Sequence, residues 1–279
     1  MQGVINQVDY ELEYFVFGNG LKVLIAFHGF NNNAHDFRVL GDLIGDEYKI
    51  IAVNLFFHGA STAEDDLIKN GLSTDELKKM FIEIADRFPA QSYTLLGFSL
   101  GGRIVLKIVE LLPEKIERVI LLAPDGIHIS SLYRLLTNSR LGKWVFKQSI
   151  TNPSIFFKVA IFLRKTRLVS EKKYQFAWQN FDTQEKRRKV FLIWMVFRKI
   201  ISRKSEIKTI IRKYKIPFDL FFGKYDKIIP PSIGKSLQKG ITEFVTLNVH
   251  EAGHKLLKEK VLKDISLKIS PKKNDAKKP

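Results

Sequence analysis

Short apolar runs alternate with helix-like segments along most of this chain, and this alternation is what most constrains its fold. The runs are rich in Ile, Val and Leu, as expected for strands that are buried on both faces. Strands that alternate with helices form a mostly parallel sheet with helices on both faces. The first half of the chain carries three such runs, at 49–54, 93–96 and 118–123, and two helix-like segments, at 73–88 and 102–112.

The N-terminal residues predict an antiparallel start to this sheet. Every second residue from 8 to 14 is apolar, which is typical of a strand with one buried face. A strong turn signal, Gly18-Asn19-Gly20, precedes a second apolar run at 22–27. We therefore expect two strands joined by a hairpin.

The strand pattern stops near residue 127 and resumes near residue 216. Between these positions the sequence is helical, basic and aromatic, which predicts an inserted helical cap. The pattern then continues to a Lys-rich tail, which is predicted to be disordered. This divides the chain into an α/β core of residues 1–126 and 216–270, a basic cap or lid of residues 127–215, and a flexible tail of residues 271–279.

The net charge of +17 comes almost entirely from the cap. Residues 130–215 hold 22 of the 46 Lys and Arg residues but four of the 29 Asp and Glu residues. Three interpretations stay open: a solvated outer face, attraction to an anionic membrane surface, or binding of an anionic substrate such as a thioester of a phosphate-bearing carrier. Nucleic acid is disfavoured because no recognised binding motif accompanies the charge.

The motif Gly97-Phe98-Ser99-Leu100-Gly101 follows an apolar run and opens a helix-like segment. This G-x-S-x-G pattern is typical of a nucleophile elbow, a strained strand-to-helix turn that exposes a reactive serine. Gly97 and Gly101 give the backbone room to fold back on itself. Ser99 is therefore the candidate nucleophile, and it needs a histidine base and a carboxylate that orients the histidine.

The chain resembles the α/β-hydrolase family over almost its whole length. It shares the elbow and the alternation of strands and helices, and its candidate catalytic residues follow the family's order of Ser, then Asp, then His. The resemblance is to the branch with a serine nucleophile and a helical cap. It implies a mostly parallel eight-stranded sheet with helices on both faces and a cap inserted after the sixth strand. A serine at position 99 argues against the epoxide hydrolase and haloalkane dehalogenase branches, which attack through a carboxylate.

The resemblance implies His254 as the base and Asp226 as the acid. His254 belongs to a Gly-His pair after the last predicted strand, and Asp226 lies in a Gly-x-x-Asp-x-x-x-Pro pattern after the preceding strand. His250, at the end of the last strand, is the rival base. Asp125, after the sixth strand, is the rival acid because some family members carry the acid there.

The family's oxyanion hole uses two backbone amides, which correspond here to Phe30 and Leu100. His28 and Gly29 form the supporting His-Gly loop, and we expect His28 to hold that loop rather than to move protons. One family stretch, Asp-x-x-Gly-His-Gly-x-Ser, is altered: Asn54 stands where aspartate is usual, and a Phe-Phe pair at 56–57 replaces Pro-Gly.

Together these features predict a serine hydrolase that cleaves an ester or thioester of a hydrophobic acyl group through an acyl-enzyme. The apolar cap segments 155–163 and 190–201 suggest the hydrophobic acyl group. Carbon–carbon or amide cleavage by the same triad, and a non-catalytic protein that binds a ligand or a membrane, remain alternatives. We expect no metal or other cofactor, because the triad needs none and the histidines lack metal-site spacing.

The sequence also bears on location. It has no cysteine, and the first 13 residues do not resemble a secretory signal. Its longest apolar run, residues 190–197, is far too short for a membrane span. We therefore expect a cytoplasmic protein that acts on a small molecule, with possible peripheral contact with an anionic membrane; the oligomeric state is left open.

Overall fold

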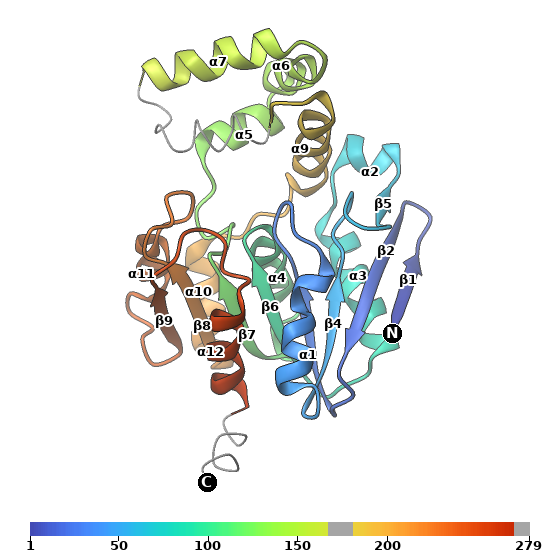
Figure 1. Ribbon diagram of the computed structural model, residues 1–279, viewed down its shortest axis with the longest axis vertical. Coiled ribbons are helices and arrows are strands. Elements are labelled where there is room, and N and C mark those ends of the chain that lie inside the picture. The colour runs from blue at the N-terminus through green and yellow to red at the C-terminus, as the bar shows by residue number, and fades with distance from the viewer. Residues whose placement is uncertain (167–180, 271–279) are drawn as a thin grey trace.

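A computed structural model describes residues 1–166 and 181–270 as one mixed β-sheet flanked by helices, with further helices above it (Figure 1). The predicted tail, 271–279, lies outside the described residues. The strands are β1 (Gln2–Asn6), β2 (Tyr10–Phe17), β3 (Lys22–Phe27), β4 (Tyr48–Val53), β5 (Thr62–Ala63), β6 (Tyr93–Phe98), β7 (Ile116–Leu122), β8 (Phe218–Gly223) and β9 (Val245–His250).

The sheet has the order β1-β2-β4-β3-β6-β7-β8-β9, and every pair from β4 to β9 is parallel. β1 and β2 form an antiparallel edge. The mostly parallel architecture is therefore confirmed. Within residues 1–166 and 181–270 the sheet has nine strands rather than eight, and the smallest is the two-residue β5, which pairs with β2 off the main order.

The predicted hairpin between β2 and β3 is wrong. β4 lies between these two strands, antiparallel to β2 and parallel to β3. The turn residues Asn19 and Gly20 both donate backbone hydrogen bonds to the carbonyl of Gly45, in the loop before β4. This turn therefore packs on a distant loop, and it spaces its two flanking strands far enough apart to admit β4.

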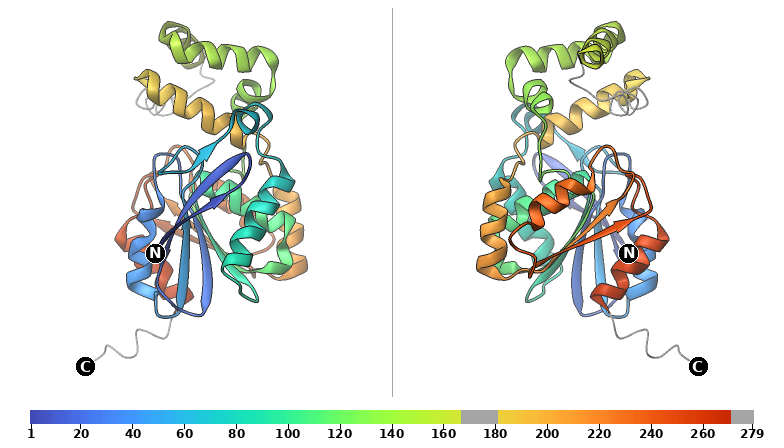
Figure 2. Two further views of the ribbon diagram at one scale, coloured as in Figure 1. Left: turned by 90° about the vertical axis from the view of Figure 1, so that its right-hand side faces the viewer. Right: turned by 90° about the vertical axis from the view of Figure 1, so that its left-hand side faces the viewer.

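Helices cover both faces of the sheet (Figure 2). α1 (Arg38–Ile44) and α12 (Glu259–Ile269) contact each other on one face. α3 (Thr74–Arg87), α4 (Leu100–Leu111) and α10 (Lys204–Tyr214) cover the other, with α4 in contact with both neighbours. Smaller elements complete the core: η1 (Ala34–Phe37), α2 (Asp65–Asn70), η2 (Pro113–Lys115) and α11 (Pro231–Gln238).

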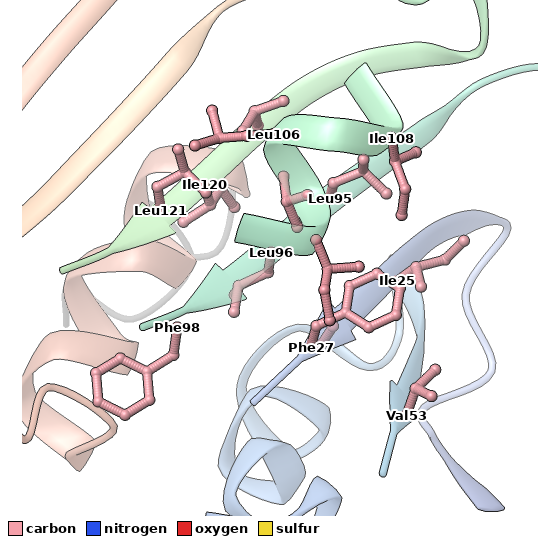
Figure 3. Close-up of a cluster of buried hydrophobic side chains, with 14 of the residues drawn as sticks. Ile25, Phe27, Val53, Leu95, Leu96, Phe98, Leu106, Ile108, Ile120 and Leu121 are labelled. Atoms are coloured by element: carbon pink, nitrogen blue, oxygen red, sulfur yellow. The ribbon is translucent and has the colours of Figure 1, made fainter. Parts of the chain in front are cut away.

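The centre of the core is the contact between α4 and the strands beneath it (Figure 3). Ile25 of β3, Leu95 of β6 and Leu121 of β7 are fully buried in one hydrophobic cluster. α4 is buried almost all round because α3 and α10 flank it. Since α4 begins directly after Ser99, this packing fixes the position of the candidate nucleophile.

The helices α5 (Ser131–Asn138), α6 (Arg140–Thr151), α7 (Pro153–Lys165) and α9 (Gln184–Phe197) lie beyond the carboxyl end of β7 (Figure 1). All described elements between residues 127 and 215 are helical. The predicted cap range includes α10, which packs against α4 of the core. Within residues 1–166 and 181–270, no helix is both long enough and apolar enough to cross a membrane.

Candidate active site

Ser99 lies in a sharp turn between β6 and α4. Its backbone has φ 49° and ψ −113°, a left-handed conformation that is costly for a residue with a side chain. Three hydrogen bonds hold it there: Ser99 donates to the carbonyl of Leu122, and its own carbonyl accepts from the amides of Gly102 and Asp125. The carboxyl ends of β6 and β7 thus maintain the strained turn.

The two motif glycines are required by close backbone packing. A side chain at Gly101 would place its Cβ 2.0 Å from the carbonyl oxygen of Phe27, and one at Gly97 would lie 2.7 Å from the carbonyl oxygen of Gly101. Atoms cannot approach this closely without a shift of the backbone. The predicted need for small residues beside the elbow therefore has a direct structural cause.

The structure brings Ser99, His254 and Asp226 together. His254 Nε2 lies 3.1 Å from Ser99 Oγ, and His254 Nδ1 lies 2.7 Å from Asp226 Oδ2. Because a carboxylate can only accept, Nδ1 carries the proton and Nε2 can accept the proton of the hydroxyl group. The other oxygen of Asp226 accepts from the amides of Ile228 and Ile229, which fixes this buried carboxylate in place.

The rival acid, Asp125, and the rival base, His250, each contact other residues. Asp125 forms an ion pair with the buried guanidinium of Arg103, which also donates to the hydroxyl of Tyr133 in α5 at 2.6 Å. Burial alone would lower the pKa of Arg103, but the charge of Asp125 and the contacts with Tyr133 together outweigh it and raise the pKa. His250 stacks on Phe221 and lies 3.5 Å from a carboxylate oxygen of Asp264.

The two amides assigned to the oxyanion hole flank the nucleophile. Leu100 is the first residue of α4, and Phe30 follows Gly29 in the loop after β3. A Cβ at Gly29 would lie 3.0 Å from Cβ of Ser99, so this loop packs directly against the elbow. Across residues 1–166 and 181–270, neither amide donates to a protein acceptor, which leaves both N–H groups able to bind a substrate oxygen.

His28 holds the loop after β3 through both ring nitrogens. Nδ1 donates to the carbonyl of Gly29 at 2.7 Å, and Nε2 accepts from the amide of Leu55 at 3.0 Å. Burial lowers the pKa of His28 to about 4, so the ring is neutral at pH 7. These contacts match the loop-holding role that we expected for His28.

His58 packs edge-on against His28, with the ring centroids 4.7 Å apart. Its Nδ1 lies 3.0 Å from the carbonyl of Phe56. Burial, followed by the proximity of His28 and Lys189, lowers the pKa of His58 to about 3. The structure therefore places two neutral, buried histidines beneath the loop that carries Phe30.

Asn54, which stands where the family usually has aspartate, is hydrogen-bonded to a carboxylate that the sequence analysis did not identify. Its Nδ2 donates to Oε2 of Glu13 at 2.5 Å, and its Oδ1 accepts from the amide of Ala34 at 2.7 Å. Burial favours a raised pKa for Glu13, but hydrogen bonds from Ala60, Asn54 and Gln2 outweigh it and lower the pKa. Glu13 thus supplies the negative charge, and Asn54 the matching donor.

An apolar cluster within the predicted cap range packs against the loop that carries Phe30. The side chain of Phe30 packs against this cluster, together with Trp194 of α9. The rings of Trp194 and Phe146 meet edge to face, with their centroids 5.2 Å apart. The buried members of the cluster are Phe146, Phe181, Val190 and Met195.

Comparison with known proteins assigns the chain to a family. Residues 22–261 match the family described as alpha/beta hydrolase fold. The chain is 24% identical over 244 residues to hydrolase YugF of Bacillus subtilis (strain 168), covering 86% of each protein. It is 28% identical over 106 residues to a pimeloyl-[acyl-carrier protein] methyl ester esterase of Nitrosomonas europaea, a match that covers 38% of each.

Solved structures resemble the whole chain. A thermophilic esterase from Thermogutta terrifontis aligns with a TM-score of 0.64 and 17% identity, over 96% of this chain and 98% of the esterase. The thioesterase domain from the curacin biosynthetic pathway aligns with a TM-score of 0.63 and 14% identity, over 96% and 98% of the two chains. At these identities the likeness establishes the fold.

Proposed function

Because the chain belongs to the α/β-hydrolase fold family and is a hydrolase of that fold, we propose that it cleaves an ester or thioester through an acyl-enzyme on Ser99. One observation carries this proposal: the continuous contact from Ser99 Oγ through the His254 ring to the buried Asp226. That arrangement supplies a nucleophile, a base and a group that orients the base. The chemistry requires no metal or other cofactor.

In the first half of the reaction, Ser99 Oγ attacks the carbonyl carbon while His254 Nε2 takes the hydroxyl proton. The carbonyl oxygen becomes an oxyanion, which the amides of Phe30 and Leu100 bind. Asp226 stabilises the positive imidazole. When the tetrahedral intermediate collapses, the alcohol or thiol leaves with the proton from His254, and the acyl group remains on Ser99.

In the second half, water attacks the acyl-enzyme. His254 takes a proton from the water, the same two amides bind the new oxyanion, and Ser99 leaves with the proton returned by His254. The products are the free enzyme and a carboxylic acid. Ser99 is therefore the nucleophile in the first half and the leaving group in the second, and His254 takes and returns a proton in each half.

The acyl group is proposed to be hydrophobic. The apolar cluster that includes Phe146, Val190 and Met195 lies against Phe30, the residue whose amide would bind the oxyanion. An acyl chain attached to Ser99 would extend toward apolar side chains, whose contact with hydrocarbon is favourable. The name of the Nitrosomonas relative, an esterase, agrees with cleavage of an ester. A cytoplasmic location is part of the proposal, on the ground that the sequence lacks cysteine.

Hydrolysis of p-nitrophenyl acyl esters of increasing chain length tests the proposal. We expect turnover that depends on Ser99 and that is faster for medium or long acyl chains than for acetate. The Ser99→Ala variant should fold normally and lose turnover by about 10⁴-fold or more. Full activity of that variant would refute the proposed nucleophile, and a preference for acetate would refute the hydrophobic acyl group.

A further inference from the structure

The outer helices of the cap expose an unusual number of large apolar side chains. Leu141 and Trp144 of α6 are 70% and 57% exposed, and Phe162 of α7 is 62% exposed. Leu135 of α5 is 58% exposed. Single exposed apolar residues are normal for a protein surface, but a group of them on adjoining helices indicates an interaction site.

These side chains come from elements that touch one another. Leu141 and Trp144 are three positions apart in α6, so they project from one side of that helix. Phe146 lies on another side and is buried in the cap cluster. The end of α5 meets the start of α6 closely: a Cβ at Gly142 would lie 2.0 Å from the carbonyl oxygen of Leu135. α6 also contacts α7.

The same helices are strongly basic. Residues 131–165 contain seven Lys or Arg residues and no Asp or Glu. Exposed basic residues lie on all three helices: Arg134 on α5, Arg140 and Lys147 on α6, and Lys158 on α7. The outer cap therefore combines apolar side chains, which favour burial, with positive charges that no acidic residue of these helices balances.

We propose that this surface, formed by Leu135, Leu141, Trp144 and Phe162 with the surrounding Lys and Arg residues, docks on an anionic lipid bilayer. We call it the docking face. A partner for it must accept apolar side chains and attract positive charge, and the interface of a bilayer that contains anionic lipids does both. Lys and Arg can extend to the phosphate groups while Trp, Leu and Phe insert among the acyl chains near the surface.

The position of the docking face suits this partner. α6 and α7 form the end of the molecule farthest from the sheet (Figures 1 and 2). A flat surface could therefore contact them without meeting the core. The inference does not depend on catalysis, so its test uses binding alone.

Sedimentation of the full chain with lipid vesicles tests the proposal. We expect binding to phosphatidylcholine vesicles that contain phosphatidylglycerol, and much weaker binding to phosphatidylcholine alone. The Leu141→Ser/Trp144→Ser variant should bind the anionic vesicles at least about tenfold more weakly. Leu21→Ser is the matched control, because Leu21 is 97% exposed in the turn before β3, and it should bind like the unchanged protein.

A charge-reversal variant tests the contribution of electrostatic attraction to vesicle binding. Arg140→Glu/Lys147→Glu should weaken binding to the anionic vesicles, whereas Lys235→Glu/Lys239→Glu, which changes two exposed lysines near α11, should have a much smaller effect. Equal binding to neutral and anionic vesicles would overturn the proposal. Unchanged binding of the Leu141→Ser/Trp144→Ser variant would also overturn it. So would a protein that binds DNA but does not bind the vesicles.

Insertion of Trp144 gives a separate readout. We expect the tryptophan fluorescence to shift to shorter wavelength on vesicle binding. In Trp144→Phe, binding should persist while most of the shift disappears, because phenylalanine keeps an apolar side chain but removes the reporter. A full shift in Trp144→Phe would show that a different surface meets the bilayer and would overturn the assignment of the docking face.

Discussion

His254 Nδ1 lies 2.7 Å from Oδ2 of Asp226, a carboxylate that is buried and held by two backbone amides. Replacing Asp226 by Asn should lower kcat by about 10⁴-fold, because an amide at this position no longer stabilises the charged imidazole and favours the wrong tautomer. Stability should change little, since the amide oxygen can still accept from Ile228 and Ile229. Ester hydrolysis and urea unfolding of the variant provide the two measurements.

Asp125→Asn should behave in the opposite way. Asp125 pairs with the buried Arg103, so its loss leaves that guanidinium without a counter-charge. We expect a loss of stability on the order of 1–3 kcal/mol in urea unfolding. Turnover under conditions where the variant is folded should remain within about tenfold of normal. A larger fall in kcat for Asp125→Asn than for Asp226→Asn would reverse the assignment of the acid.

Asn54→Asp, which restores the residue usual in the family, should destabilise this protein. It would place a second carboxylate where Nδ2 of Asn54 now donates to Glu13 at 2.5 Å. We expect a loss on the order of 1–3 kcal/mol at pH 7. The Glu13→Gln/Asn54→Asp double variant should recover part of it, because one of the two carboxylates is removed. Equal stability of Asn54→Asp and the unchanged protein would contradict this role for Glu13.

Acid should destabilise the protein through His28 and His58. Their pKa values in the folded state are about 4 and about 3, below the value of 6.5 for the unfolded chain. The unfolded state therefore binds more protons, and stability is lost as the pH falls from 6.5 toward the folded values. Between pH 7 and pH 5 we expect a loss on the order of 2 kcal/mol per histidine in urea unfolding.

The His58→Gln variant tests this origin of the pH dependence. Its stability should fall less between pH 7 and pH 5 than that of the unchanged protein. His128→Gln removes an exposed histidine and should leave the pH dependence as it was. Glu13 also has a lowered pKa, but its contribution is lost below its ordinary value of 4.5, outside this pH range. Equal slopes for all three proteins would rule out the buried histidines as the cause.

Much of the fold was predictable because it depends on local sequence. The prediction for 73–88 matches α3, which starts after Ser73, where Ser73 and Glu76 bond reciprocally to each other's amides. The elbow was predictable for the same reason, since the room that Ser99 needs is provided by glycines two positions away on either side. The order of Ser99, Asp226 and His254 likewise follows strand ends that are visible in the sequence.

The errors concern contacts between distant parts of the chain. The β2–β3 hairpin failed because β4, more than 20 residues later, pairs with both strands. The apolar pattern of α10 indicates a helix but does not indicate that it packs on α4 instead of the other helices of the cap range. The pair formed by Glu13 and Asn54 joins residues 41 positions apart, and the sequence signal for it was the amide that replaces the usual aspartate.

Labelling by a fluorophosphonate most directly tests the central claim, that the contacts of Ser99 with His254 make it a nucleophile. The protein should react with one equivalent of reagent, and mass spectrometry of the digested product should locate the adduct on Ser99. Ser99→Ala should not react, and His254→Ala should react far more slowly, because it cannot remove the hydroxyl proton. An adduct on another residue, or equal labelling of Ser99 in His254→Ala, would contradict the account.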